Sequence, residues 1–259
     1  MNICQTKWQL PTPPLKAGIV GMPPLEVIQY LNVHDTVIHD LDARLVPDSI
    51  EGTSPYLPRV YCAILRTVVL NALRLSLDAI YIDVGAGKCD SALHVSTILA
   101  NILSIPIIRT RNQDRRNFGT PVCRTRLALL EKFLTITEGV KQHRRQDSVN
   151  PQPCQPRAGF WGVPPRDFSL LELFPDTTHI YGWTRCMENK TPAAEDLELY
   201  YNPAIPTVFF AQSFCAKAGL AKFLADRHPC ALYLDADYNC GGSTKAKIQA
   251  FLELSGAYK

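Results

Sequence analysis

Short apolar runs alternate along the chain with longer stretches in which apolar residues recur at helical spacing. The short runs include residues 16–20, 78–84 and 207–212, and the helical stretches include residues 59–75 and 92–103. Strands that alternate with helices are typical of parallel sheets whose two faces are both covered by helices. The pattern therefore predicts an α/β fold.

This pattern occurs twice in the chain. Residues 17–30 read AGIVGMPPLEVIQY, and residues 158–171 read AGFWGVPPRDFSLL. In both copies a short apolar run is followed by Gly-x-Pro-Pro and an acidic residue, which suit the first turn of a helix. Later in each copy, an apolar run leads to a cysteine, Cys89 in the first and Cys215 in the second. We predict two Rossmann-like lobes with parallel sheets, related by an internal repeat.

The two copies and the regions between them predict the domain organisation. Residues 1–15 contain several prolines and form an irregular leader, and residues 16–140 form an N-terminal α/β lobe. Residues 141–157 carry charge and proline without periodicity, so they are predicted to link the lobes. Residues 158–259 form the C-terminal α/β lobe, in which we expect a helix to begin at Pro165.

Composition and charge narrow the class of protein. The chain has 259 residues, of which 46% are hydrophobic, so it can bury a substantial core. Its net charge of +3 is too small to indicate nucleic-acid binding. No apolar stretch approaches the roughly 18 residues of a membrane span, and the N-terminus has no signal-peptide pattern. We therefore expect a cytoplasmic protein with no nucleic acid or membrane partner.

The chain contains nine cysteines and no CxxC pair. Disulfides are not expected in a reducing compartment, and buried free cysteines often act as small hydrophobic residues. Cys89 and Cys215 differ from the others because they follow apolar runs at matched places in the two copies. The first copy is also longer than the second, and its extra residues surround Cys62. Cys186 and Cys240 are further candidates near the same predicted face.

Cys62, Cys89 and Cys215 are predicted to meet in the cleft between the lobes, because open α/β sheets place their chemistry at the carboxyl ends of strands. Soft thiolate ligands select iron–sulfur clusters, zinc or copper. Three ligands leave one metal position open, as catalytic sites require. The spacing alone does not choose among these metals. It also leaves open a purely structural role for the cysteines.

Several segments occur in a fixed order along the chain: Gly21–Glu26, YCAILRT with Cys62, Cys89–Asp90, Gly159–Pro165, Phe214–Cys215 and the ending LDADYNCGGSTKAKIQAFLE. In this order and spacing the chain resembles the 2-hydroxyacyl-CoA dehydratase family, which includes benzoyl-CoA reductase subunits and double-cubane cluster proteins. In that family's terminal helix an arginine is usual where this chain has Lys247.

The resemblance implies a cofactor, an activity and partners. Three cysteines would hold a [4Fe-4S] cluster, or half of a double-cubane [8Fe-9S] cluster, and they correspond to Cys62, Cys89 and Cys215. The protein would be a subunit of an ATP-activated low-potential reductase or of a 2-hydroxyacyl-CoA dehydratase-like enzyme. An ATP-hydrolysing iron–sulfur activator protein would supply electrons. The subunit would pair with an identical or related subunit in a homodimer or heterodimer.

Two other functions remain open on the sequence. The segment IDVGAGKC resembles the first motif of S-adenosylmethionine-dependent methyltransferases through Asp83, Gly85 and Gly87, although Cys89 replaces the motif's third glycine. Alternatively, the chain is a non-catalytic electron-transfer or scaffold subunit.

Other side chains near predicted strand ends are further candidates for the site. His39 and His179 occupy matched places in the two copies and could donate protons, because imidazole titrates near neutral pH. Arg185 follows a predicted strand of the second lobe and could line a pocket beside Trp183. Ordinary core or loop roles are the alternative for these residues. The glycines predicted to let a cofactor approach the backbone are Gly21, Gly87 and Gly162.

Overall fold

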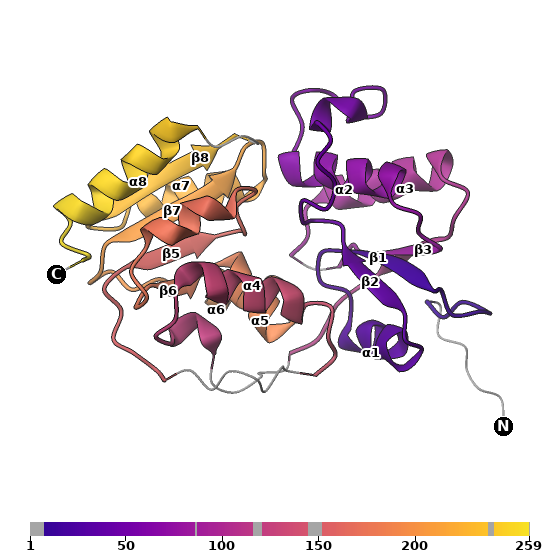
Figure 1. Ribbon diagram of the computed structural model, residues 1–259, viewed down its shortest axis with the longest axis horizontal. Coiled ribbons are helices and arrows are strands. Elements are labelled where there is room, and N and C mark those ends of the chain that lie inside the picture. Colours follow the sequence, from indigo (N-terminus) through magenta and orange to yellow (C-terminus); the bar gives the residue numbers. More distant parts are fainter. Residues whose placement is uncertain (1–7, 86, 116–120, 145–151, 238–240, 259) are drawn as a thin grey trace.

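The computed structural model describes residues 8–85, 87–115, 121–144, 152–237 and 241–258, and it contains two four-stranded parallel sheets (Figure 1). The first sheet has the order β2-β1-β3-β4 and the second the order β6-β5-β7-β8. The prediction of an α/β fold with two Rossmann-like lobes is therefore confirmed. The strands are β1 (Lys16–Val20), β2 (Val37–Asp40), β3 (Ala79–Asp83), β4 (Ile107–Thr110), β5 (Gly159–Gly162), β6 (His179–Tyr181), β7 (Thr207–Gln212) and β8 (Ala231–Ala236).

The two sheets also share a register. Gly18 pairs with His39 and Ile80, and Gly159 pairs with His179 and Thr207. Residues of the two copies that lie the same number of positions from these glycines therefore occupy corresponding places in their sheets. The internal repeat itself stays a prediction, which a superposition of the two lobes would test.

In the N-terminal lobe, the strand side chains alternate between two apolar clusters, as expected for a sheet covered on both faces. Ile80 and Ile82 of β3 pack in the cluster that contains the buried residues of α2 (Ala63–Arg74) and α3 (Asp90–Ile102). Tyr81 packs on the opposite face, in the cluster that contains the buried residues of α1 (Leu25–Val33). A short 3-10 helix, η1 (Ile50–Thr53), contacts α2.

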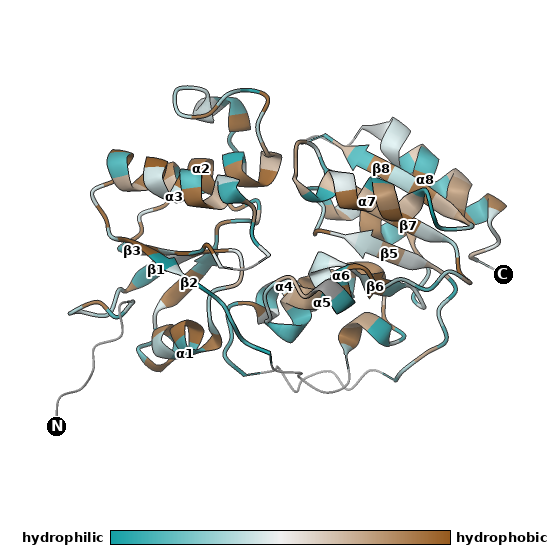
Figure 2. Cartoon of the chain, turned by 180° about the vertical axis from the view of Figure 1, so that it is seen from behind, coloured by the Kyte–Doolittle hydropathy of each residue, from teal (hydrophilic) through white to brown (hydrophobic). Residues whose placement is uncertain are grey.

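In the C-terminal lobe, α7 (Lys217–Ala225) packs against Trp161 and Phe209 on one face of the sheet. Figure 2 shows apolar residues along α7 where it runs beside β7. The other face is covered by α8 (Gly242–Leu254) and a 3-10 helix, η3 (Phe168–Leu173). Two shorter helices, α5 (Trp183–Asn189) and α6 (Glu195–Glu198), follow β6.

One helix within residues 16–140 packs with the C-terminal lobe. This helix, α4 (Leu129–Gly139), contacts α5 and η3 (Figure 1). The ring of Phe133 lies 5.1 Å from that of Phe160 and 6.1 Å from that of Phe168, centre to centre. The apolar face of α4 therefore completes the core of the second lobe, and the chain crosses between lobes before the predicted linker.

The helix predicted to begin at Pro165 is instead the short η3. Its cap is Asp167, whose side chain accepts a hydrogen bond from the backbone nitrogen of Ser169 at 3.0 Å. Trp183 and Arg185, predicted at the open end of a strand, lie in α5. That helix begins directly after Gly182, where φ is +73° and a side chain would be strained. No helix among the described residues is long and apolar enough to cross a membrane.

Candidate functional site

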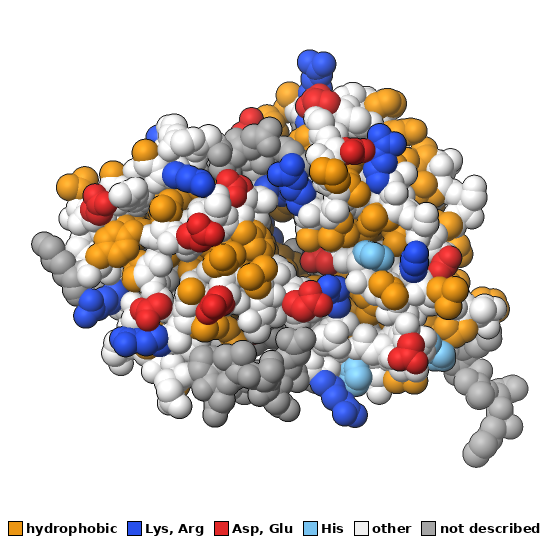
Figure 3. Space-filling view, in the orientation of Figure 1, with side chains coloured by type: hydrophobic (Ala, Val, Ile, Leu, Met, Phe, Trp, Pro, Cys, Tyr) orange, Lys and Arg blue, Asp and Glu red, His pale blue; other side chains and the backbone are white. Residues whose placement is uncertain are grey.

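A cavity of about 720 Å³ lies between the two lobes. Its walls include residues at or just beyond the carboxyl ends of β1, β2, β3, β5 and β7. Figure 3 shows an opening between the lobes on the face drawn there. This position agrees with the general rule that open α/β sheets bind ligands beyond the carboxyl ends of their strands.

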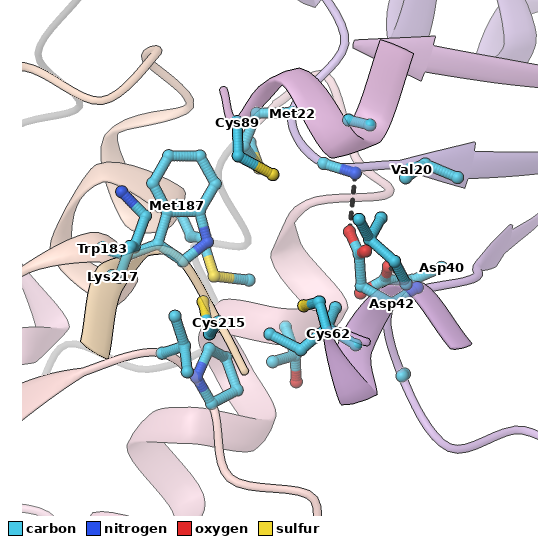
Figure 4. Close-up of a pocket in the computed structure, with 18 of the residues that line it drawn as sticks. Val20, Met22, Asp40, Asp42, Cys62, Cys89, Trp183, Met187, Cys215 and Lys217 are labelled. Atoms are coloured by element: carbon cyan, nitrogen blue, oxygen red, sulfur yellow. Dashed lines mark hydrogen bonds between the residues drawn. The ribbon is translucent and has the colours of Figure 1, made fainter. Parts of the chain in front are cut away.

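Cys62, Cys89 and Cys215 all line this cavity (Figure 4). Each lies at the beginning of a helix: Cys62 is the N-cap of α2, Cys89 is the N-cap of α3, and Cys215 precedes the N-cap of α7. Helix N-termini carry unpaired N–H groups and a partial positive charge, and they favour thiolates and bound anions. Three such N-termini therefore converge on the cavity.

Local backbone contacts bring Cys62 close to Cys215. The nitrogen of Ala63, in the first turn of α2, donates to the carbonyl oxygen of Ser213 at 3.3 Å, which joins the two lobes. The turn after β7 places Phe214 at a φ of +60°, an unusual conformation for a large side chain. Backbone strain of this kind often occurs at functional sites, and here it precedes Cys215.

The thiols of Cys62 and Cys215 lie close enough to interact, and this interaction is the main influence on the pKa of each. Figure 4 shows these two side chains near each other, with Cys89 farther away and Trp183 alongside. The interaction with Cys62 lowers the pKa of Cys215 to about 7, with help from the backbone nitrogen of Lys217. The same interaction, followed by burial, raises the pKa of Cys62. Cys215 is therefore the member of the pair that ionises near neutral pH, and thiolates are the form that binds metals.

Among the described residues, no group of three or more His, Cys, Asp or Glu side chains is placed to hold a metal ion. A single zinc ion would need its sulfur ligands about 2.3 Å from one centre. An iron–sulfur cubane instead takes each thiolate on a different iron, so its ligands are spread more widely. Three thiolates around one cavity are the type of ligand that such a cluster requires.

Three aspartates form the N-terminal wall of the cavity: the buried Asp40 at the end of β2, the half-buried Asp42 just after it, and the buried Asp83 at the end of β3. The backbone nitrogen of Gly21 donates to Asp42 Oδ2 at 2.6 Å (dashed line in Figure 4), and the nitrogen of Asp42 donates to Asp40 Oδ1 at 3.1 Å. Burial, together with the charge of Asp42, raises the pKa of Asp40 to about 7. Burial also raises the pKa values of Asp42 and Asp83.

The aspartates are site residues that our sequence analysis missed. Their signal was present, because the segments HDLD and IDVG place acidic residues at the ends of apolar strands. Carboxylates at that position of an open α/β sheet lie beside its binding crevice. Among the three, the sequence analysis names only Asp83, as part of the methyltransferase-like motif.

The C-terminal wall carries the aromatic ring of Trp183, and two lysines, one from each lobe, lie near this ring. The Nζ atom of Lys88 lies 4.3 Å from the centre of the Trp183 ring, and that of Lys217 lies 5.0 Å from it. Both distances are in the range of cation–π attraction. Lys217 also forms an ion pair with Glu198. The two lysines therefore bring positive charge into the cavity, and the charge of Lys88 also acts on the three aspartates.

The two candidate histidines do not line the cavity. His39 precedes Asp40 in β2, and successive strand side chains point to opposite faces of a sheet, so the two residues lie on different sides. His179 is the first residue of β6, at the end of the strand away from the cavity. Its Nε2 atom lies 3.0 Å from the carbonyl oxygen of Cys154, and burial lowers its pKa to about 4.

Arg185 and Gly162 are also absent from the cavity walls. Arg185 is buried, and its Nη1 atom forms an ion pair with Oε2 of Glu188, in the same helix, at 2.7 Å. A Cβ atom at Gly162 would collide with the carbonyl oxygen of Phe210 on the neighbouring strand. The glycine is therefore needed for strand pairing.

Gly21 and Gly87, by contrast, line the cavity with positive φ values of +70° and +76°. A Cβ atom at Gly21 would collide with the end of the Lys88 side chain. At Gly87 it would collide with Ala193, and at Gly85 it would press against the backbone of Asn112. These contacts come from the packing of the protein itself, so they account for glycine at the three positions without a bound cofactor.

The remaining described cysteines lie elsewhere. Cys123 and Cys186 are fully buried and do not line the cavity, and neither do Cys154 and Cys230. Cys186 is therefore not placed to replace one of the three predicted ligands. Cys240, the other predicted substitute, lies outside the described residues.

Comparisons with known proteins do not assign the chain to a family. No family model matches it, and no curated protein matches it in sequence.

Proposed function

We propose that the protein is an iron–sulfur protein in which Cys62, Cys89 and Cys215 hold one [4Fe-4S] cluster or half of a double-cubane [8Fe-9S] cluster. The observation that supports this best is the convergence of three cysteines, each at the start of a helix, on one cavity between the lobes. Helix N-termini favour the negative charge that three thiolates bring. When bound, such a cluster supplies single electrons at low potential.

The proposed enzyme is a subunit of an ATP-activated low-potential reductase or a 2-hydroxyacyl-CoA dehydratase-like enzyme. The cavity leaves room beside the thiols, and its volume is in the range of small-molecule sites. Trp183 and Met187 offer apolar contact to a substrate, while Lys88 and Lys217 offer charge. An ATP-hydrolysing iron–sulfur activator would supply the electrons to a homodimer or heterodimer, and the cytoplasm is the reducing compartment that suits such chemistry.

The test is iron content after anaerobic purification or reconstitution. We expect about four iron atoms per wild-type chain and a brown protein. Cys62→Ser, Cys89→Ser and Cys215→Ser should each lose most of the iron. Cys154→Ser and Cys230→Ser are matched controls that should keep it, because both cysteines lie outside the cavity. Wild-type protein without iron, or full iron in any of the three cavity variants, would contradict the proposal.

The proximity of the Cys62 and Cys215 thiols in the cavity favours a second candidate, a reversible disulfide between them. Its formation would release two protons and two electrons to a disulfide oxidant. Cys89 separates the two candidates, because a cluster needs it and the disulfide does not. A Cys89→Ser variant that still forms the Cys62–Cys215 disulfide, from a wild-type protein that never binds iron, would favour the second candidate.

A further inference from the structure

We propose that the carboxyl pair of Asp40 and Asp42 is the proton donor of the cavity and supplies the proton that accompanies each electron delivered to the substrate. This inference rests on the proposed function and adds a residue role to it. It also explains why buried acidic side chains lie in a cavity whose other walls carry thiols, an indole ring and lysines.

The first support is geometric. Asp40 and Asp42 line the same cavity as the three cysteines, and Figure 4 shows them on the wall that also carries Cys62. Backbone hydrogen bonds hold both carboxyl groups in place, from Gly21 to Asp42 and from Asp42 to Asp40. A proton donor needs such fixed placement, because proton transfer requires the donor within hydrogen-bond reach of its acceptor.

The second support is electrostatic. Two carboxylates that share a buried site cannot easily ionise together, so the pair titrates as a unit and retains a proton to higher pH. Burial is the largest cause of the raised pKa of Asp40, about 7, and the charge of Asp42 is the next. Lys88 and Lys141 act in the opposite direction on Asp40, as Lys88 and Arg166 do on Asp42. The other charged or titratable side chains of this region of the cavity are Arg44, Cys62 and Asp83.

The third support is the surroundings of the carboxylate that remains after transfer. Lys88 interacts electrostatically with Asp40, Asp42 and Asp83. Its ammonium group can therefore stabilise whichever aspartate is ionised. Asp83 is itself held by the backbone nitrogens of Gly85 and Asn112, both 3.0 Å from its Oδ1 atom. A nearby charge of opposite sign reduces the free-energy cost of ionising a buried carboxyl group.

In each half of a two-electron reduction, the substrate gains one electron from the low-potential donor of the proposed function and one proton from the Asp40–Asp42 pair. The pair is left with one additional negative charge. It takes a proton from water before the next electron arrives, so the pair is unchanged after each cycle.

The first measurement is an infrared titration of the full chain without iron. Wild-type protein should show a protonated carboxyl band that disappears with a midpoint near pH 7. Asp40→Asn, which keeps the shape and removes the proton, should lack this transition. Asp42→Asn should shift it to lower pH, because a neighbouring negative charge is removed. Asp48→Asn is the control, since Asp48 is exposed and pairs with Arg74 outside the cavity. A wild-type protein with no carboxyl titrating above about pH 6 would overturn the inference, whatever the iron content.

The second measurement is the reduction potential of the iron-loaded protein as a function of pH. Coupling of one proton to one electron should lower the wild-type potential by up to about 59 mV per pH unit, the value of a tenfold change for one electron. The slope should become shallow in Asp40→Asn and stay unchanged in Asp48→Asn. A flat wild-type profile in iron-loaded protein would overturn the donor role and leave the proposed function standing. A wild type that binds no iron would overturn both, and the iron assay distinguishes these two failures.

Discussion

The two lobes have the same strand order, yet they bring different chemistry to the cavity between them. By the shared register, Asp40 and Asp42 of the N-terminal lobe correspond to Ile180 and Gly182 of the C-terminal lobe. Asp83 likewise corresponds to Phe210. The acidic wall is therefore specific to the first lobe, while the second contributes Trp183, Lys217 and Cys215. The fold therefore determines where chemistry can occur, and a few strand-end residues determine which chemistry each wall supports.

The largest expected effect concerns α4 and shows which lobe's core this helix stabilises. Phe133→Ala should lower the free energy of unfolding by about 3–5 kcal/mol, because it removes a fully buried ring that packs against Phe160 and Phe168. Hydrogen exchange should rise more in β5 and β7 than in β1 and β3. Leu134→Ala on the same helix is the control, since that side chain is half exposed and should cost far less. Faster exchange mainly in β1 and β3 would assign α4 to the N-terminal lobe instead.

The next effect compares corresponding glycines. Gly162→Ala should destabilise the fold by about 3 kcal/mol or more, because its Cβ would meet the rigid backbone oxygen of Phe210. Gly21→Ala should cost about 1–2 kcal/mol, since its Cβ meets the flexible end of Lys88, which can move. Urea unfolding of both variants measures the difference. Equal losses would mean that the two glycines have the same role in both lobes.

A third prediction contrasts the pH dependence of the lobes. The pKa of Asp40 is raised from 3.8 to about 7, so its contribution to stability is full below about pH 4 and is lost as the pH rises through 7. The pKa of His179 is lowered from 6.5 to about 4, so its contribution is full above about pH 6.5 and is lost as the pH falls through 4. Each effect is on the order of 3–4 kcal/mol.

Unfolding free energies measured at several pH values should separate these opposite trends. Asp40→Asn should remove the loss toward neutral pH, and His179→Gln should remove the loss toward acidic pH. Asp48→Asn should leave both trends unchanged, because its carboxyl is exposed. A variant that changes the trend assigned to the other residue would refute this division between the lobes.

The smallest expected effect concerns the thiols that meet across the cavity. Cys62→Ala removes the interaction that is the main cause of the lowered pKa of Cys215, so that pKa should rise from about 7 toward 9.0. Alkylation of Cys215 at neutral pH in metal-free protein should slow by about tenfold, because the thiolate is the reactive form. Peptide mass spectrometry after timed alkylation measures the rate. Cys89→Ser should leave the alkylation rate of Cys215 unchanged. A slower rate in that variant would show that all three thiols are coupled.

Much of the fold could be predicted because its determinants are local. Apolar runs and helical spacing lie within single segments, so β1 and β7 match the predicted runs at 16–20 and 207–212. The Pro165 prediction was wrong because a capping aspartate and a short 3-10 turn compete with a regular helix there. The membership of α4 was missed for a different reason, because an amphipathic pattern does not say which core the apolar face will join.

The sequence by itself determined the two α/β lobes and the positions of Cys89 and Cys215 after apolar strands, because periodicity and position after a strand are properties of short segments. Only the tertiary structure decided that these thiols share one cavity with Asp40 and Asp42. It also decided that the neighbouring His39 is not part of that cavity. The physical reason is that strand order, register and the two-residue alternation of side chains determine which distant residues meet, and these depend on packing across the whole chain.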